Sequence, residues 1–214
     1  TVIPTINRGL DEAESDLDQL PDGRLIVTWG LDDDAEIYTQ TINAPPVPNV
    51  SQELVPTMID SQDPSLGVLS NGGRLLVVEA SDAHRSGIWG QLYNDLGEPV
   101  GAIFQINDES PDYQRDPEVT VLSDGTLLVT WLSGVVSSKG DMYAQRFSAD
   151  GTQELGVEFI LNTDSITNSG EADNARSLEI TALDGGGFVA VWYSDYPTSS
   201  SSSDGLYMQV FDAT

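Results

Sequence analysis

Four copies of one short segment give this chain an internal repeat with a period of about 50 residues. The copies are DGRLIVTW (22–29), NGGRLLVVE (71–79), DGTLLVTW (124–131) and DGGGFVAVW (184–192). Aligned on its last residue, the second copy has Glu79 where the other three have Trp. A period of this length, built from short strands, indicates a β-propeller or another repeat array.

A second repeated segment follows each copy of the first and alternates with period two. Its copies are EIYTQTI (36–42), GIWGQLY (87–93), DMYAQRF (141–147) and GLYMQVF (205–211). An aromatic residue, a glutamine and an apolar residue share one face in every copy, as the alternation of a strand requires. We interpret the glutamines as half-buried amides that satisfy backbone groups of an adjacent strand. They are Gln40, Gln91, Gln145 and Gln209.

Each repeat predicts up to four strands. The first strand ends before the Asp-Gly or Asn-Gly pair, which signals a hairpin because both residue types accept positive φ at little cost. The second strand is a nearly continuous apolar run, which is typical of a strand covered on both faces. A third repeated segment predicts the fourth strand, as AIFQIND (102–108), EFILNTD (158–164) and, more weakly, ELVPTMID (53–60).

The fourth repeat ends at Thr214 without this third segment, whereas TVIPTIN (1–7) reads as a permuted copy of it. We therefore predict an all-β fold, a four-bladed β-propeller in one domain, with Thr1–Asn7 as the outer strand of the last blade. The predicted blades are about 14–60, 61–112, 113–165 and 174–214, with strand 1–7 added to the last. The alternatives are a plain leading strand at 1–7, and half of a larger ring completed by a second chain.

The charge of the chain argues against several classes of partner. Eight Lys and Arg residues against 35 Asp and Glu residues give a formal net charge of −27, which repels nucleic acid and anionic membrane surfaces. The chain contains no run of 18 apolar residues, so the sequence predicts no membrane insertion. The absence of cysteine excludes disulfides, thiolate metal sites and Cys nucleophiles. A cation, a glycan or a protein remains as a ligand, and we expect a monomer or a homodimer.

The repeat pattern DG-x-[LF]-x-V-x-W, then [YW]-x-Q-x-[FY], then G-x-E-F-x-[LIV]-N-[TD] resembles the repeats of secreted bacterial RTX, or hemolysin-type calcium-binding, proteins. The resemblance covers nearly the whole chain and is best for Asp116–Asp164. It implies a propeller-like fold in a secreted or cell-surface bacterial protein, and it implies no activity. The chain contains no GGxGxDxxx nonapeptide, so the calcium-binding role of those nonapeptides does not carry over.

Three acidic residues precede the first strand at equivalent positions and form the candidate metal site. They are Glu14, Asp63 and Asp116, and the fourth repeat offers Ala175 instead. The innermost strand of a propeller blade borders the central channel, so these carboxylates are expected to converge near the axis, where oxygen ligands suit calcium. The alternative is that acidic residues at strand starts only cap turns.

Other candidate sites are weaker. The run Asp32–Asp34 lacks the spacing of an EF-hand loop and reads as a solvated charge run. His84 is the single histidine and lies in a predicted loop, which argues against a Ser-His-Asp triad or a histidine zinc site.

The sequence as a whole favours a non-enzymatic binding or adhesion module with a calcium ion near the propeller axis. The first alternative is a polysaccharide-acting enzyme with a carboxylate pair at the channel mouth. The second is a structural spacer in a large surface protein that binds no ligand.

Overall fold

The computed structural model describes residues 15–31, 36–42, 52–55, 61–82, 85–108, 113–136, 139–162, 174–198 and 201–213. These residues form fifteen β-strands and no helix, as the repeat predicts. In this part of the chain there is accordingly no helix able to cross a membrane.

The strands pair into four antiparallel sheets that follow the four repeats. Sheet 1 contains β1 (Ser15–Gln19), β2 (Leu25–Leu31), β3 (Glu36–Ile42) and β4 (Gln52–Val55). Sheet 2 contains β5 (Gln62–Val68), β6 (Arg74–Ser81), β7 (Ser86–Tyr93) and β8 (Pro99–Gln105). Sheet 3 contains β9 (Tyr113–Val121), β10 (Leu127–Val136), β11 (Lys139–Phe147) and β12 (Glu154–Ile160). Sheet 4 contains β13 (Asn174–Ala182), β14 (Phe188–Thr198) and β15 (Ser201–Phe211), and one parallel bridge, Gly140 to Asn174, joins it to sheet 3.

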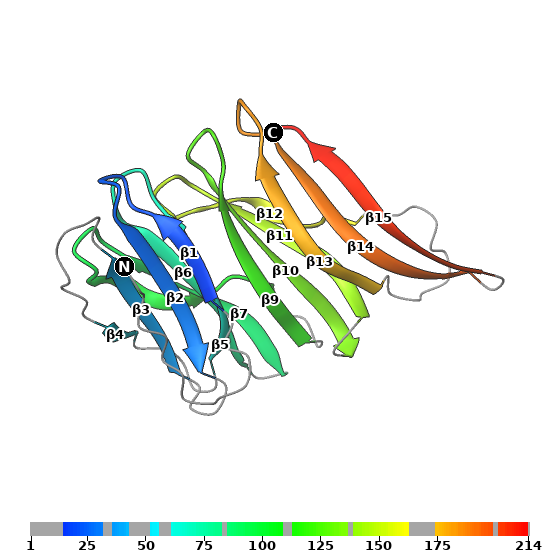
Figure 1. Cartoon of the computed structure of the whole chain (residues 1–214), viewed down its shortest axis with the longest axis horizontal. Helices are drawn as coiled ribbons and strands as arrows, with labels where there is room; N and C mark the ends of the chain where they lie inside the picture. The colour runs from blue at the N-terminus through cyan, green and yellow to red at the C-terminus, as the bar shows by residue number, and fades with distance from the viewer. Residues whose placement is uncertain are drawn as a thin grey trace.

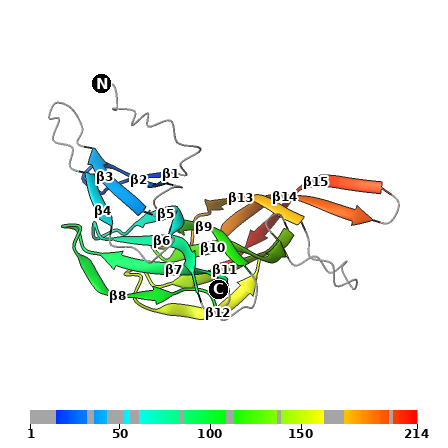
Figure 2. The same ribbon diagram turned by 90° about the horizontal axis from the view of Figure 1, so that it is seen from below.

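The sheets follow one another in a row, with sheet 1 and sheet 4 at opposite ends (Figures 1 and 2). The first strands of the sheets come together: β1 packs beside β5, β5 beside β9, and β9 beside β13. This succession of sheets around their first strands is the arrangement of propeller blades. The ends of the row do not meet, so a closed four-bladed ring is not shown.

The Asp-Gly and Asn-Gly pairs form the predicted hairpin turns between the first and second strands. In the first turn, Gly23 N–H donates to Leu20 O at 2.8 Å, and Leu20 N–H donates to Arg24 O at 2.8 Å. Gly23 has φ 86°, a left-handed conformation that glycine adopts without a steric penalty. The same bonding closes the turns at Gly72 and Gly125. These are three-residue loops with glycine at the left-handed position.

Apolar side chains fill the space between consecutive sheets and form three separate cores. Sheets 1 and 2 enclose one core around Ile26, Ile37 and Leu76. The core between sheets 2 and 3 contains Ile88, Trp131 and Phe147, and the core between sheets 3 and 4 contains Met142, Phe188 and Trp192. Each interior sheet therefore buries both of its faces, which explains the continuous apolar runs of the second strands.

The strand register corrects the alignment at Glu79. Trp29 lies opposite Tyr38, Trp131 opposite Tyr143 and Trp192 opposite Tyr207, and the rings of each pair stack. In sheet 2 the residue at the tryptophan position is Val78, opposite Trp89. The prediction that Glu79 replaces the tryptophan is wrong by one residue, because the second copy of the segment extends one residue past that position.

Gln91 has the structural role predicted for it, because its amide reaches the backbone of the adjacent strand β8, whereas Gln145 bonds to the next residue of its own strand. Gln91 Nε2 donates to Leu92 O at 2.8 Å and to Val100 O at 3.2 Å, and Gln145 Nε2 donates to Arg146 O at 3.0 Å. Both side chains are buried. A buried amide that meets backbone carbonyls avoids the cost of an unsatisfied polar group.

Sheet 4 has three strands among the described residues, whereas the other sheets have four. The sequence predicts Thr1–Asn7 as the missing outer strand. Residues 1–14 lie outside the described part of the chain, so this assignment remains a prediction.

The close approach of β5 to β9 gives a first testable prediction. A Cβ added at Gly67 would lie 2.5 Å from Val119 Cγ1, so Gly67→Ala should overpack this junction and lower the free energy of unfolding by about 1–3 kcal/mol. Gly30→Ala is the matched control, since its nearest neighbour would be Ile37 Cδ1 at 3.4 Å. Chemical denaturation measures both. Equal stability of the two variants would contradict the close packing of the first strands.

Candidate functional site

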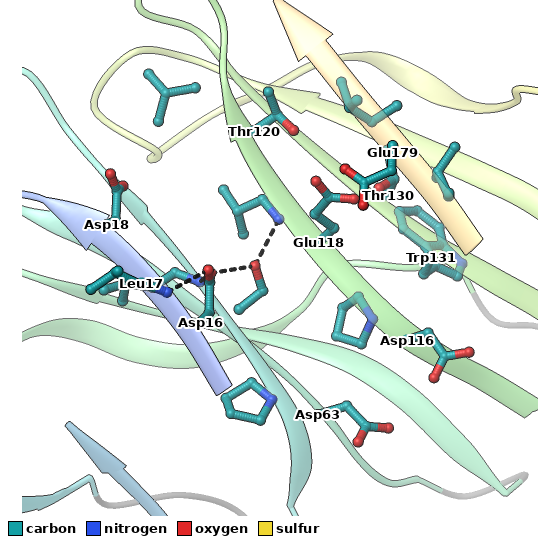
Figure 3. A pocket seen from close by; sticks show the side chains of 18 of the residues that line it. Asp16, Leu17, Asp18, Asp63, Asp116, Glu118, Thr120, Thr130, Trp131 and Glu179 are labelled. Atoms are coloured by element: carbon teal, nitrogen blue, oxygen red, sulfur yellow. Dashed lines mark hydrogen bonds between the residues drawn. The ribbon is translucent and has the colours of Figure 1, made fainter. Parts of the chain in front are cut away.

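The first strands of all four sheets line one groove, here named the central groove (Figure 3). Its volume is about 910 Å³, and residues of β10 complete the wall. Six carboxylic acids and no Lys, Arg or His belong to the lining that the structure describes. The acids are Asp16, Asp18, Asp63, Asp116, Glu118 and Glu179.

Side-chain hydrogen bonds hold three of the first strands together along the groove. Val119 N–H donates to Ser65 Oγ at 3.0 Å, and Ser65 Oγ–H donates to Asp16 Oδ2 at 3.0 Å. The same Asp16 oxygen accepts from Leu66 N–H at 2.8 Å, and Asp18 Oδ2 accepts from Val68 N–H at 2.9 Å. Asp16 and Asp18 thus satisfy N–H groups on the free edge of β5, which would otherwise be unpaired.

Glu118 occupies the same position in β9 that Asp16 occupies in β1, four residues before the leucine that enters the turn. Within the described residues its carboxyl group has no hydrogen-bonding partner of the kind that Asp16 has. Burial raises the pKa of Glu118 to about 7, and the negative charges of Glu179 and Asp16 add to the rise. A half-buried acid that is still partly protonated near neutral pH can donate a proton.

Glu179 and Thr130 surround the carboxyl group of Glu118. Thr130 lies directly opposite Glu118 on the adjacent strand, and Figure 3 shows Glu179 beside both. The Thr130 side chain is 1% exposed, and its hydroxyl is one of the buried polar atoms that lack a hydrogen-bond partner. Two carboxyl groups and a free hydroxyl therefore meet at one point of the groove wall.

The predicted metal residues Asp63 and Asp116 both line the central groove, at some distance along it from Glu118 (Figure 3). Both have left-handed backbones, with φ 50° and 51°, at the irregularity where β5 and β9 each carry an extra residue. Asp tolerates this conformation better than most residues, which gives a conformational reason for the residue type at a β-bulge. The third predicted residue, Glu14, lies outside the described residues.

Glu79 lies next to Asp63 and close enough to Asp116 to feel its charge, although it does not line the central groove. Its side chain is 7% exposed, and burial raises its pKa, against the effect of hydrogen bonds with Ser86, Gln62 and Asp63. The charge of Asp116 raises the pKa of Glu79 further. Across the described residues, no group of three or more His, Cys, Asp or Glu side chains is arranged to hold a metal ion. The calcium site therefore stays a prediction from the sequence.

The register also corrects the fourth equivalent of the predicted metal residues. Arg176 and Glu179 flank the bulge of β13 as Arg115 and Glu118 flank that of β9, so Ser177, and not Ala175, is the counterpart of Asp116. The loop residues Asp32–Asp34 and His84 lie outside the described residues.

Sequence reasoning missed the position that gives the groove its acid pair. This position holds Asp16, Ser65, Glu118 and Glu179, each four residues before a repeated leucine. The repeated leucines are Leu20, Leu69, Leu122 and Leu183. Counting back from them would have found the three acids. An alignment on the start of each first strand misses these acids, because the bulges in β5, β9 and β13 shift the count by one residue.

Solved structures with the same fold include several carbohydrate-active enzymes. A protein of unknown function from Dyadobacter fermentans matches with a TM-score of 0.65 and 11% identity, over 95% of this chain and 62% of its own. A GH43 β-1,3-galactosidase, from a β-propeller family, matches with a TM-score of 0.55 and 12% identity, over 92% and 42%. A PL25 ulvan lyase bound to -[GlcA(1-4)Rha3S]- matches with 0.54 and 11%, over 83% and 44%.

This chain thus spans between two fifths and just over three fifths of the length of these three structures. At these identities the likeness shows the fold alone, an all-β arrangement like that of GH43 propellers. No family model matches the sequence, and no curated protein matches it.

The raised pKa of Glu118 predicts a specific pH dependence of stability. The folded state holds a proton on Glu118 up to about pH 7, whereas the unfolded chain loses it near pH 4.5. The free energy of unfolding should therefore fall as pH rises between these values. Glu118→Gln should remove this fall, so that the variant melts several degrees above the wild type at pH 8 and at the same temperature below pH 4.5. A parallel pH profile for both proteins would contradict the shift.

The conformational role of Asp116 can be separated from a metal role. Asn keeps the preference for the left-handed region, so Asp116→Asn should melt within a degree of the wild type without metal, and Asp116→Ala should lose about 1 kcal/mol. Both variants remove a carboxylate. A calcium-dependent rise in melting temperature that Asp116→Asn abolishes would support the metal site. Equal stability of the two variants would contradict the conformational role.

Proposed function

We propose that this chain is a polysaccharide-acting module whose central groove takes a neutral glycan and whose Glu118 donates the proton that cleaves a glycosidic bond. The observation that carries the proposal is the half-buried carboxyl group of Glu118, with a pKa of about 7, beside Glu179 in the groove wall. Hydrolysis of a glycoside requires one protonated and one ionised carboxyl group. The similarity in fold to the GH43 galactosidase is consistent with this chemistry.

The roles of the two acids follow from their surroundings. Burial favours the neutral form of Glu118, which makes it the proton donor, while the exposed Glu179 is the second carboxyl group of the pair. Asp16 is held by Ser65 and the backbone of β5, so its part is to add negative charge near Glu118. Thr130 lies opposite Glu118, and its buried hydroxyl is placed to hydrogen-bond the donor acid.

The charge of the groove selects the class of glycan. Its described lining holds six acids and no cationic side chain, and the whole chain has a formal charge of −27. An anionic sugar would meet repulsion without a compensating Lys or Arg. We therefore propose a neutral polysaccharide, in contrast to the uronate-containing ligand of the ulvan lyase.

Glycan binding without turnover is the second candidate, and it matches the adhesion module that the sequence favours. The observation in its favour is that Asp16 and Asp18 serve the fold through their bonds to β5, which shows that acids in this groove need not be catalytic. A four-bladed ring closed within this chain, secretion and a bound calcium ion complete the proposal. The succession of first strands around one groove supports the ring.

The catalytic proposal predicts the release of reducing ends from a neutral polysaccharide such as arabinan, xylan or galactan. Glu118→Gln should lower kcat by about 10²–10⁴-fold, and the wild-type rate should fall as pH rises through about 7, because the donor must be protonated. Thr120→Ala, also in the groove wall, is the matched control and should keep most of the activity.

Three results decide between the candidates. Turnover that survives Glu118→Gln unchanged would contradict the assignment of the donor. Binding of the same polysaccharides by calorimetry, with no reducing ends released, would favour the adhesion module. Preferred turnover of polygalacturonate would contradict the neutral ligand.

A further inference from the structure

β15 leaves an apolar face uncovered at one end of the row of sheets. Leu206, Met208 and Val210 are 76%, 69% and 58% exposed. The register makes them the counterparts of buried residues in β7 and β11. Those buried residues are Ile88, Gly90 and Leu92 in β7, and Met142, Ala144 and Arg146 in β11.

β1 and β2 leave a second apolar face uncovered at the other end. Leu17 is 58% exposed and Leu25 is 37% exposed. The positions that correspond to Leu17 are Leu66, Val119 and Ile180, which are 3%, 9% and 9% exposed because a preceding sheet covers each of them. Leu17 and Leu25 therefore belong to an interface for which the described structure shows no partner sheet.

The outer strands of sheets 2 and 3 end in the same contact, here named the Asn latch. Ile106 N–H donates to Ile88 O at 2.8 Å, and Asn107 Oδ1 accepts from Ile88 N–H at 2.8 Å. One repeat later, Leu161 N–H donates to Met142 O at 2.7 Å, and Asn162 Oδ1 accepts from Met142 N–H at 2.8 Å. Asn107 and Asn162 are each 5% exposed. The latch is an apolar residue followed by asparagine, and it pairs with both the N–H and the C=O of one buried apolar residue in the third strand, Ile88 in β7 and Met142 in β11.

Leu206 is the residue of β15 at the latch position, since it corresponds to Ile88 and Met142. The matching apolar-Asn pair at the start of the chain is Ile6-Asn7. Asn7 precedes β1 by a short connection, just as Asn107 precedes β9 and Asn162 precedes β13. In the repeats, the latch before a first strand belongs to the preceding sheet, which covers that first strand. By the same order, Ile6-Asn7 would belong to the outer strand of the sheet that covers Leu17 and Leu25.

We propose that residues 1–7 of this chain add to β15 as the fourth strand of sheet 4, with the Asn latch closed between Ile6-Asn7 and Leu206. The added strand carries sheet 1 onto the exposed face of β15, so that Leu17 and Leu25 meet Leu206, Met208 and Val210. This closure would bury both uncovered apolar faces against each other and would pair the open edge of β15 with a strand. Pro4 lies opposite Met208 in this register and has no N–H, so the strand makes one ladder bond fewer than β8 does.

The absence of cysteine makes the proposal testable by a single cross-link. In the full chain, Ile6→Cys with Leu206→Cys places two thiols opposite each other on one face, and mild oxidation should join them. The monomer band is cut from a non-reducing gel and digested with trypsin. The expected product is peptide 1–8, which ends at Arg8, disulfide-linked to peptide 177–214. Thr5→Cys with Leu206→Cys is the control, because Thr5 faces the other way in this register and should cross-link much less.

A stability measurement tests the latch independently. Asn7→Ala leaves Leu206 N–H without its acceptor and should lower the melting temperature by about 2–6 °C, whereas Thr5→Ala should leave it unchanged. The absence of a cross-link between positions 6 and 206 in both monomer and dimer would overturn the proposal. Equal melting temperatures of Asn7→Ala and Thr5→Ala would contradict it as well. A cross-link found only in covalent dimers would also overturn it, because a second copy would then supply the strand. Neither result bears on glycan cleavage, which is measured separately.

Discussion

The coverage of both faces of each sheet is the constraint on which the rest of this structure depends. A four-stranded sheet with apolar residues on both faces is stable only between two neighbours, and sheets 2 and 3 have them. Sheets 1 and 4 each have one neighbour in the described structure, and their other faces expose the large apolar side chains of Leu17, Leu206 and Met208. The same packing that explains the interior of the row therefore defines complementary ends.

The first strands pose a second problem, because their inner edges face the central groove without a partner strand. In β5 this edge is satisfied by the carboxylates of Asp16 and Asp18, and in β9 one N–H is satisfied by Ser65. Acidic residues in the groove are thus first of all a solution to backbone hydrogen bonding. Glu118 has no such bond within the described residues, and its burial, together with the charges of Glu179 and Asp16, raises its pKa to about 7.

The sequence predicted the all-β fold and its four sheets because the repeated residues are ones that backbone turns and strand alternation require. Gly23, Gly72 and Gly125 are required by the left-handed turn, and the alternation around Gln91 and Gln145 is required by the strand, so both could be read from composition and period. The strand register at the bulges could not be predicted from the sequence, because the one extra residue in β9 and in β13 does not change the repeat pattern. This is why Ala175 was paired with Asp116 in place of Ser177. The pKa of Glu118 depends on its burial in the groove wall and on the charge of Glu179, which is 61 residues away in the chain. The RTX-like resemblance stays a prediction, since no family model matches.

One repeated position shows how a symmetric array acquires an asymmetric site. Asp16, Ser65, Glu118 and Glu179 are equivalent in register, and the first two serve the junctions between sheets. Glu118 is larger than Ser65, has no such bond within the described residues, and faces a second glutamate in place of a hydroxyl. The result destabilises the fold above neutral pH, because the ionised form of Glu118 is both desolvated and repelled. A carboxyl group that costs stability and makes no such bond within the described residues supports our proposal that Glu118 acts in proton transfer at the junction of sheets 3 and 4.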